Sequence, residues 1–152
     1  MFSEINYDKI NTMSWIILAL STAIFYGVYN FFIKVSSGHI NQIAGAVILQ
    51  LVAMLVGGVI LLFIKFTNVS IEISNKGILY AVLAGVFVGL AEITSFFVFS
   101  KGITLSIGLP IIIGGSVVFG SLLGILFLKE VLTPIHLLAI LLIIVGIVLL
   151  VK

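Results

Sequence analysis

The sequence has no cysteine and no arginine, and it carries little charge of either sign. Among its 152 residues, 8% are charged, whereas soluble domains carry about 25% charged residues. Without cysteine, disulfides, thiol chemistry and thiolate metal sites are excluded. The two histidines, His39 and His136, lie far apart without ligand spacing, so no metal site is predicted. No basic stripe is present, which argues against a nucleic-acid partner.

The chain also lacks any polar stretch long enough to fold as a soluble domain, and 62% of its residues are hydrophobic. Apolar runs of about 17 to 25 residues are long enough to cross a hydrocarbon core of about 30 Å. Five such runs follow a polar N-terminal tail over residues 1–14, and we expect them at 15–33, 43–64, 77–99, 103–128 and 135–151. The sequence therefore predicts an all-α, multi-pass protein of the cell membrane, surrounded by the lipid bilayer, with five transmembrane helices. No nucleophile–base pair or phosphate loop is visible, so neither an enzyme nor a cofactor is predicted.

The third run carries one acidic residue, Glu92, a few positions past its middle. A carboxylate at that depth costs about 2.5 kcal/mol or more when it faces lipid, so it should face protein or a wet cavity. At about 100° per residue, Ala81, Gly85, Gly89, Ser95 and Phe96 share its face of the helix. As a functional group, Glu92 would bind a proton or cation, or anchor an amine. As a structural group, it would be protonated and bonded to a hydroxyl such as that of Thr94, Ser95 or a tyrosine.

The first and second runs supply further polar side chains at the depth of the membrane. Tyr26 and Asn30 lie on one stripe of the first run, and Gln50 lies in the middle of the second. These three side chains either line the same pocket and orient a substrate or form interhelical hydrogen bonds. Tyr29 and Lys34 are interpreted as anchors at the membrane interface.

The fourth run contains helix-disturbing residues. Pro110 removes a backbone donor and Gly114–Gly115 adds local freedom, so the sequence predicts an interrupted helix there. This segment is either a gate hinge or a packing kink. Small residues at interfaces let membrane helices approach closely, and we expect this role for Gly85, Gly89, Gly120 and Gly124.

The placement of lysines hardly distinguishes the two possible orientations of the chain. Five spans put the termini on opposite sides of the membrane, with four lysines on the N-terminal side and three on the other: Lys9, Lys65, Lys76 and Lys129 against Lys34, Lys101 and Lys152. The chain therefore has either a single orientation with its N-terminus inside, or a dual topology in which oppositely inserted copies pair antiparallel.

The segment Leu126–Leu150, LFLKEVLTPIHLLAILLIIVGIVLL, resembles the closing signature of the EamA module of the drug/metabolite transporter superfamily, with Glu130, Thr133, Pro134 and Gly146 at the matching places. Ser100–Pro110 and Ala23–Lys34 also resemble that module. The common form of the family has ten helices in two inverted five-helix repeats, so the resemblance implies one repeat standing alone and favours an antiparallel homodimer. The related small multidrug resistance family carries its glutamate in the first helix, and Glu92 in the third helix departs from that pattern.

Together these observations predict a secondary transporter of small-molecule metabolites, an exporter or proton-coupled exchanger, that acts as a homodimer. Two alternatives stay open. The chain could be a non-transporting membrane subunit that stabilises another protein, or a flippase for a lipid or lipid carrier.

Overall fold

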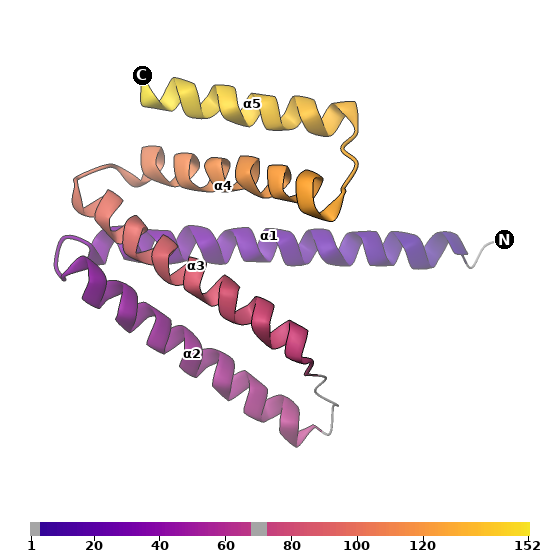
Figure 1. Ribbon diagram of the computed structural model, residues 1–152, viewed down its shortest axis with the longest axis horizontal. Helices are drawn as coiled ribbons and strands as arrows, with labels where there is room; N and C mark the ends of the chain where they lie inside the picture. The colour runs from indigo at the N-terminus through magenta and orange to yellow at the C-terminus, as the bar shows by residue number, and fades with distance from the viewer. Residues whose placement is uncertain (1–3, 68–72) are drawn as a thin grey trace.

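The computed structural model describes residues 4–67 and 73–152, and every regular element within these ranges is a helix (Figure 1). Each of the five helices is long and apolar enough to cross a membrane. The helices are α1 (Glu4–Ser36), α2 (Gln42–Phe66), α3 (Asn75–Ser100), α4 (Leu105–Leu128) and α5 (Pro134–Val151). The predicted all-α membrane fold with five spans is confirmed, and α2 to α5 begin and end within two residues of the predicted bounds.

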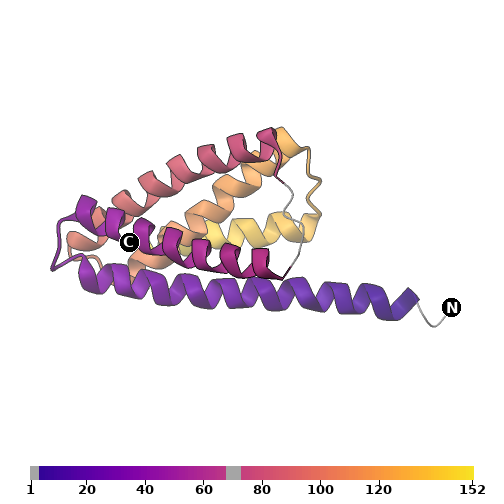
Figure 2. The ribbon, with the colours of Figure 1, turned by 90° about the horizontal axis from the view of Figure 1, so that it is seen from below.

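The first helix is longer than predicted. α1 has 33 residues, and its membrane-crossing part, Trp15–Ser36, is only the second portion of the helix. The membrane span begins at Trp15 as predicted, but the helix that contains it already begins at Glu4, within the predicted polar tail. No glycine or proline interrupts residues 4–14, and each residue added to an existing helix gains a hydrogen bond. Figure 2 shows this portion extending beyond the other helices. Residues 1–3 of the predicted tail lie outside the described residues.

Local capping chemistry explains where several helices begin. The Asn41 side chain accepts hydrogen bonds from the backbone nitrogens of Ile43 (3.0 Å) and Ala44 (3.2 Å), and Ser74 accepts from Gly77 (3.1 Å). These bonds satisfy amide groups that have no partner within the helix. α5 begins at Pro134, whose fixed φ suits the first helical position.

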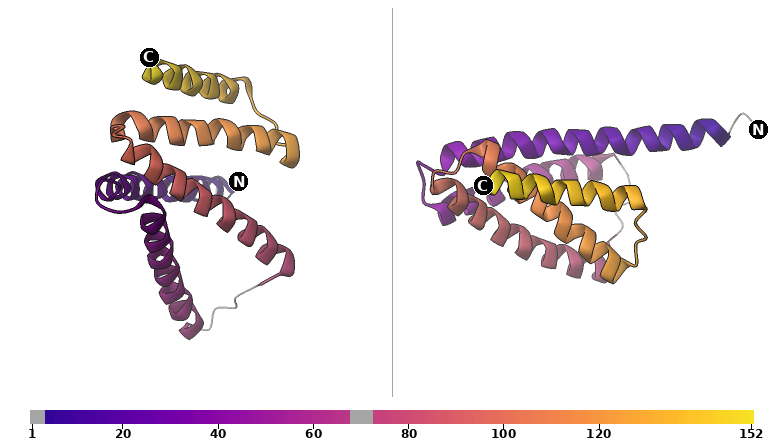
Figure 3. Two further views of the ribbon diagram at one scale, coloured as in Figure 1. Left: turned by 60° about the vertical axis from the view of Figure 1, so that its left-hand side comes forward. Right: turned by 90° about the horizontal axis from the view of Figure 1, so that it is seen from above.

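The helices form two antiparallel pairs that are joined through α1 and through a direct α3–α4 contact. α2 packs on α3, α5 packs on α4, and α1 contacts both α3 and α4. Figures 1 and 3 show the α1–α2 and α3–α4 turns at the same end of the molecule as the C-terminus. α1, α2 and α3 meet at that end and diverge toward the other (Figure 1).

The buried core lies where these helices converge. It consists of Ile33, Ala46, Phe96 and Phe99, each no more than 2% exposed. Small residues permit this close packing, because a Cβ at Gly45 would lie 2.6 Å from Cε1 of Phe96. Lys34 also lies at this end, where its Nζ donates to the Phe99 carbonyl at 3.2 Å. Lys34 therefore links α1 to the C-terminal end of α3. The sequence predicted an interface anchor at this position and did not predict this contact.

The glycines predicted to bring helices together behave differently from one another. Gly89 lies beside Gln50, whose side-chain amide would be 3.6 Å from an added Cβ. Gly85 and Gly120 face open space within the described chain, so no helix–helix contact of this chain uses them. Gly124 is covered by the side chain of Glu130 from the α4–α5 connection.

α4 runs without a break from Leu105 to Leu128, with Pro110 inside it. The predicted interruption of the fourth helix is therefore wrong. Pro110 is the sixth residue of the helix, so it removes the one backbone hydrogen bond that an amide there would donate to the Ser106 carbonyl, and the helix continues past this single missing bond. Gly114 packs against Ile143 and Ile147 of α5, whereas Gly115 faces open space within the described chain.

Candidate functional site

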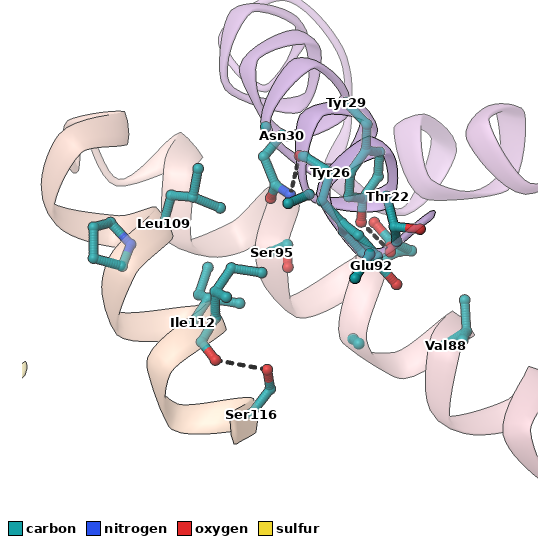
Figure 4. Close-up of a pocket in the computed structure, with 16 residues that line it drawn as sticks. Thr22, Tyr26, Tyr29, Asn30, Val88, Glu92, Ser95, Leu109, Ile112 and Ser116 are labelled. Atoms are coloured by element: carbon teal, nitrogen blue, oxygen red, sulfur yellow. Dashed lines mark hydrogen bonds between the residues drawn. The ribbon is translucent and has the colours of Figure 1, made fainter. Parts of the chain in front are cut away.

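A cavity of about 730 Å³ opens between α1, α3 and α4 (Figure 4). Small and polar residues of α1 form one wall, α3 contributes a second, and α4 closes the third with mostly aliphatic side chains. The lining residues are Ala19, Thr22, Ala23, Tyr26, Gly27, Tyr29, Asn30, Val88, Ala91, Glu92, Ser95, Leu109, Pro110, Ile112, Ile113 and Ser116. This volume lies within the range typical of small-molecule sites.

Glu92 is the centre of this cavity. Its side chain is 8% exposed, and its Oε1 accepts a hydrogen bond from the hydroxyl of Tyr29 on α1 (Figure 4). Its second carboxyl oxygen, Oε2, is buried and has no hydrogen-bond partner among the described residues. A buried acceptor without a donor is costly, so this half-satisfied carboxyl needs an explanation.

Tyr29 is held by the geometry of its own helix. Tyr26 and Tyr29 are three residues apart on α1, and their rings pack edge to face with centroids 5.7 Å apart and an interplanar angle of 76°. This is a favourable arrangement for two aromatic rings. In this arrangement the Tyr29 hydroxyl reaches Glu92, whereas Tyr26 lines the cavity and is about half-exposed.

Three other polar side chains of the walls are bonded locally. The Asn30 side-chain nitrogen donates to the Tyr26 carbonyl at 2.8 Å, and the Thr22 hydroxyl donates to the Leu18 carbonyl at 2.9 Å. On α4, the Ser116 hydroxyl donates to the Ile113 carbonyl at 2.7 Å. These bonds stay within single helices, so the Tyr29–Glu92 contact is the polar side-chain link that joins α1 to α3 inside the cavity.

The structure brings together four of the five residues predicted to bind substrate or proton. Tyr26, Asn30, Glu92 and Ser95 all line the cavity. Gln50 does not: it lies at the α2–α3 contact beside Gly89, because α2 packs on the side of α3 away from this cavity. Of the predicted hinge residues, Pro110 lines the cavity, and Gly114 and Gly115 do not.

Tyr29 is the residue that sequence reasoning missed. The sequence suggests an interface anchor at this position, although a tyrosine is one of the hydroxyl partners expected for Glu92. Thr94, another such partner, bonds to the Leu90 carbonyl of its own helix at 2.9 Å. The polar stripe of α1 is visible in the sequence, but which of its hydroxyls reaches α3 depends on how the two helices cross.

The cavity lining contains few side chains that can carry a charge or bind a metal ion. Glu92 is its one acidic residue, and no lysine or histidine stands among the lining residues. Within the described ranges, no group of three or more histidine, cysteine, aspartate or glutamate side chains could hold a metal ion. The arrangement is therefore suited to taking up and releasing a proton or binding a cationic group.

Known proteins give the following comparison. The chain is 36% identical over 135 residues to an uncharacterized protein of Methanocaldococcus jannaschii, and the alignment covers 89% of this chain and 94% of that protein. No solved structure gives a significant match. Residues 13–152 match the EamA-like transporter family. That match covers all five apolar spans, and the chain belongs to the EamA-like transporter family as a five-helix unit, half of the ten-helix transporter form.

Proposed function

We propose that this protein is a secondary transporter of small metabolites in the cell membrane, an exporter or proton-coupled exchanger that works as a homodimer. The observation that carries the proposal is the Glu92 carboxyl of the cavity lining, with one oxygen held by Tyr29 and the other buried without a partner among the described residues. Membership in a transporter family supports the same conclusion.

Proton exchange is the role that suits Glu92. An acid inside a membrane span is expensive, and such residues are usually found on ion or proton pathways. Tyr29 can hold one carboxyl oxygen in place while the other gains or loses a proton. Binding of substrate at the free oxygen and binding of a proton would then exclude one another, which is the requirement for exchange.

A second copy of the chain would complete the transport path. The walls described here come from three helices of one chain, whereas the common family form has two inverted five-helix halves. The alignment covers 94% of the Methanocaldococcus relative, which leaves little room in that protein for a second repeat. The near-even distribution of lysines, four against three, is compatible with copies inserted in both orientations and paired antiparallel. Alternating access would then be a rocking of the two copies about the midplane site.

Exchange in proteoliposomes tests the proposal. Purified protein is reconstituted, loaded with an isotope-labelled metabolite extract and diluted into unlabelled extract, and the solutes lost from the vesicles are identified by mass spectrometry. We expect loss of specific soluble metabolites from wild-type vesicles and none from empty ones. Glu92→Gln should abolish that exchange. Thr94→Ala should preserve it, because Thr94 is exposed on the same helix and bonds only to its own backbone.

The same assay distinguishes the proposed transporter from the two alternative functions. A non-transporting subunit would give no exchange and would co-purify with another membrane protein. A flippase would move a lipid-linked compound between leaflets and leave the soluble metabolites in place. Either result would contradict the proposal.

A further inference from the structure

A second cavity, of about 430 Å³, lies between α1, α2 and α3. Its walls include Phe32, Ile33, Val35, Gly45, Ile48 and Phe96, and we call it the α1–α2 groove. We propose that this groove holds one hydrocarbon chain of an anionic membrane lipid, whose headgroup lies at the end of the molecule that carries the α1–α2 turn. Binding there does not require that the protein transports anything.

The groove offers hydrocarbon and few polar groups. Tyr29 and Ser36 are its lining residues with polar side chains, and both are already hydrogen-bonded within the protein. The Tyr29 hydroxyl donates to Glu92, and the Ser36 hydroxyl donates to the Ile33 carbonyl at 3.3 Å. A polar solute would lose its bonds to water there with little to replace them. The lining therefore suits a hydrocarbon chain.

The groove also has the position that a lipid chain requires. Its rim residues Phe32, Val35 and Ile48 are exposed, whereas Ile33 and Phe96 are buried at its floor. Exposed side chains of membrane spans face lipid, so a chain can enter from the side. From Tyr29 to Ser36 the groove follows the last two turns of α1, about 10 Å at 1.5 Å per residue. It therefore leads from within the membrane to the end of the helix, where headgroups lie.

The end of the molecule that the groove reaches is positively charged. The segments 34–41, 98–105 and 150–152 lie at this end (Figure 1). They contain no aspartate or glutamate, and their residues that can carry a positive charge are Lys34, His39, Lys101 and Lys152. In the sequence segments that lead to the opposite end, lysines and acidic residues balance: Lys9, Lys65, Lys76 and Lys129 against Glu4, Asp8, Glu72 and Glu130. An anionic headgroup is therefore favoured at the end that the groove reaches.

Two of these lysines belong to the same helix end. The Lys34 Nζ donates to the Phe99 carbonyl at 3.2 Å, and Lys101 is the C-cap residue of that helix. Phe96, one turn earlier on α3, forms the floor of the groove. Each lysine near an anionic lipid surface is worth about a fivefold change in affinity. A zwitterionic headgroup gains less from the same lysines.

Lipids with identical chains test the headgroup requirement. Purified protein, stripped of lipid in detergent, is titrated with anionic dioleoylphosphatidylglycerol or zwitterionic dioleoylphosphatidylcholine, and bound lipid is counted by native mass spectrometry. We expect the anionic lipid to bind at least ~5-fold more tightly, and this preference to shrink as added salt screens the lysines. Glycerol 3-phosphate, which has no chains, should not bind measurably. Equal affinity for the two lipids, or binding of glycerol 3-phosphate as tight as that of the anionic lipid, would overturn the inference.

Variants at the rim locate the chain. Ile48→Trp fills the groove from its exposed side and should weaken the binding of both lipids. Val52→Trp is the matched control, because Val52 is exposed one turn further along α2 and does not line the groove. Wild-type affinity in Ile48→Trp would contradict the proposed site. Loss of a dimer from the spectra of Ile48→Trp, with lipid binding unchanged, would show that a second copy covers the groove and would also overturn the inference.

Lysine variants locate the headgroup, and they decide the question if Ile48→Trp does not fold. Lys101→Gln should weaken the binding of phosphatidylglycerol by ~5-fold and leave that of phosphatidylcholine unchanged. Lys65→Gln, at the opposite end of α2, should change neither affinity. Equal effects of the two lysine variants would contradict a headgroup site at the end that the groove reaches.

Discussion

Replacing Gly45 with alanine tests the packing at the end of the bundle where α1, α2 and α3 meet. A Cβ at this position would lie 2.6 Å from Cε1 and 2.9 Å from Cζ of Phe96, whereas ordinary van der Waals contact begins at about 3.4 Å. α2 or the ring would therefore have to move by about 0.8 Å. The ring cannot yield easily, because Phe96 is 2% exposed and belongs to the same core as Ile33, Ala46 and Phe99.

Two opposing contributions determine how much Gly45→Ala changes the free energy of unfolding. Overpacking a tight interior costs about 1–3 kcal/mol. Alanine in place of glycine inside a helix returns up to about 1 kcal/mol through its better helix propensity. Gly85→Ala provides the matched control, since Gly85 also lies inside a helix but faces open space within the described chain. The free energy of unfolding should therefore be lower for Gly45→Ala than for Gly85→Ala by about 1–3 kcal/mol.

Reversible unfolding in mixed micelles with increasing dodecyl sulfate, followed by circular dichroism, measures this difference. Equal stability of the two variants would refute the close contact between α2 and Phe96. A stabilised Gly45→Ala would refute it as well, because only the helix-propensity term would then remain.

Further predictions concern the contacts between helices and the orientation of the chain. A double-mutant cycle of Tyr29→Phe and Glu92→Gln should give a coupling free energy of about 0.6 kcal/mol, and at most about 1.7 kcal/mol, in the same unfolding assay; a coupling of zero would count against this hydrogen bond. Lys34→Met should lower the free energy of unfolding by about 1 kcal/mol, because the Phe99 carbonyl loses a charged donor, and unchanged stability would argue against that contact. Pro110→Ala should leave the protein folded and slow metabolite exchange if Pro110 acts as a hinge; an unchanged exchange rate would identify it as a packing residue. Reporters fused to the C-terminus should be found on both sides of the membrane, and a signal from one side alone would contradict dual topology.

Features that depend on local chemistry could be predicted from the sequence. Long apolar runs fix the number of spans, and Pro134, directly before the predicted fifth run, is the first residue of α5, although the Thr133 side chain makes no capping hydrogen bond. Glu92 could be selected because a lone acid inside a span is rare. The start of the first helix could not be predicted from hydropathy, because polar residues that cannot lie in lipid can still extend a helix beyond it.

Features that depend on how helices cross could not be predicted. Gly45 and Gly85 look alike in sequence, yet only Gly45 lies against an aromatic ring of another helix. Tyr26 and Tyr29 share one stripe of α1, and the crossing of α1 over α3 decides that Tyr29 reaches the carboxyl. Gln50 has the depth expected of a cavity residue, but its helix packs on the far side of α3.

The central claim is that Glu92 alone couples protons to transport, and the pH dependence of metabolite exchange tests it most directly. Wild-type and Glu92→Gln proteoliposomes are compared over a series of pH values, with the same cargo inside and outside. Exchange by the wild-type protein should change with pH, and the variant should show no pH-dependent exchange. A variant that keeps the wild-type pH profile would contradict the claim.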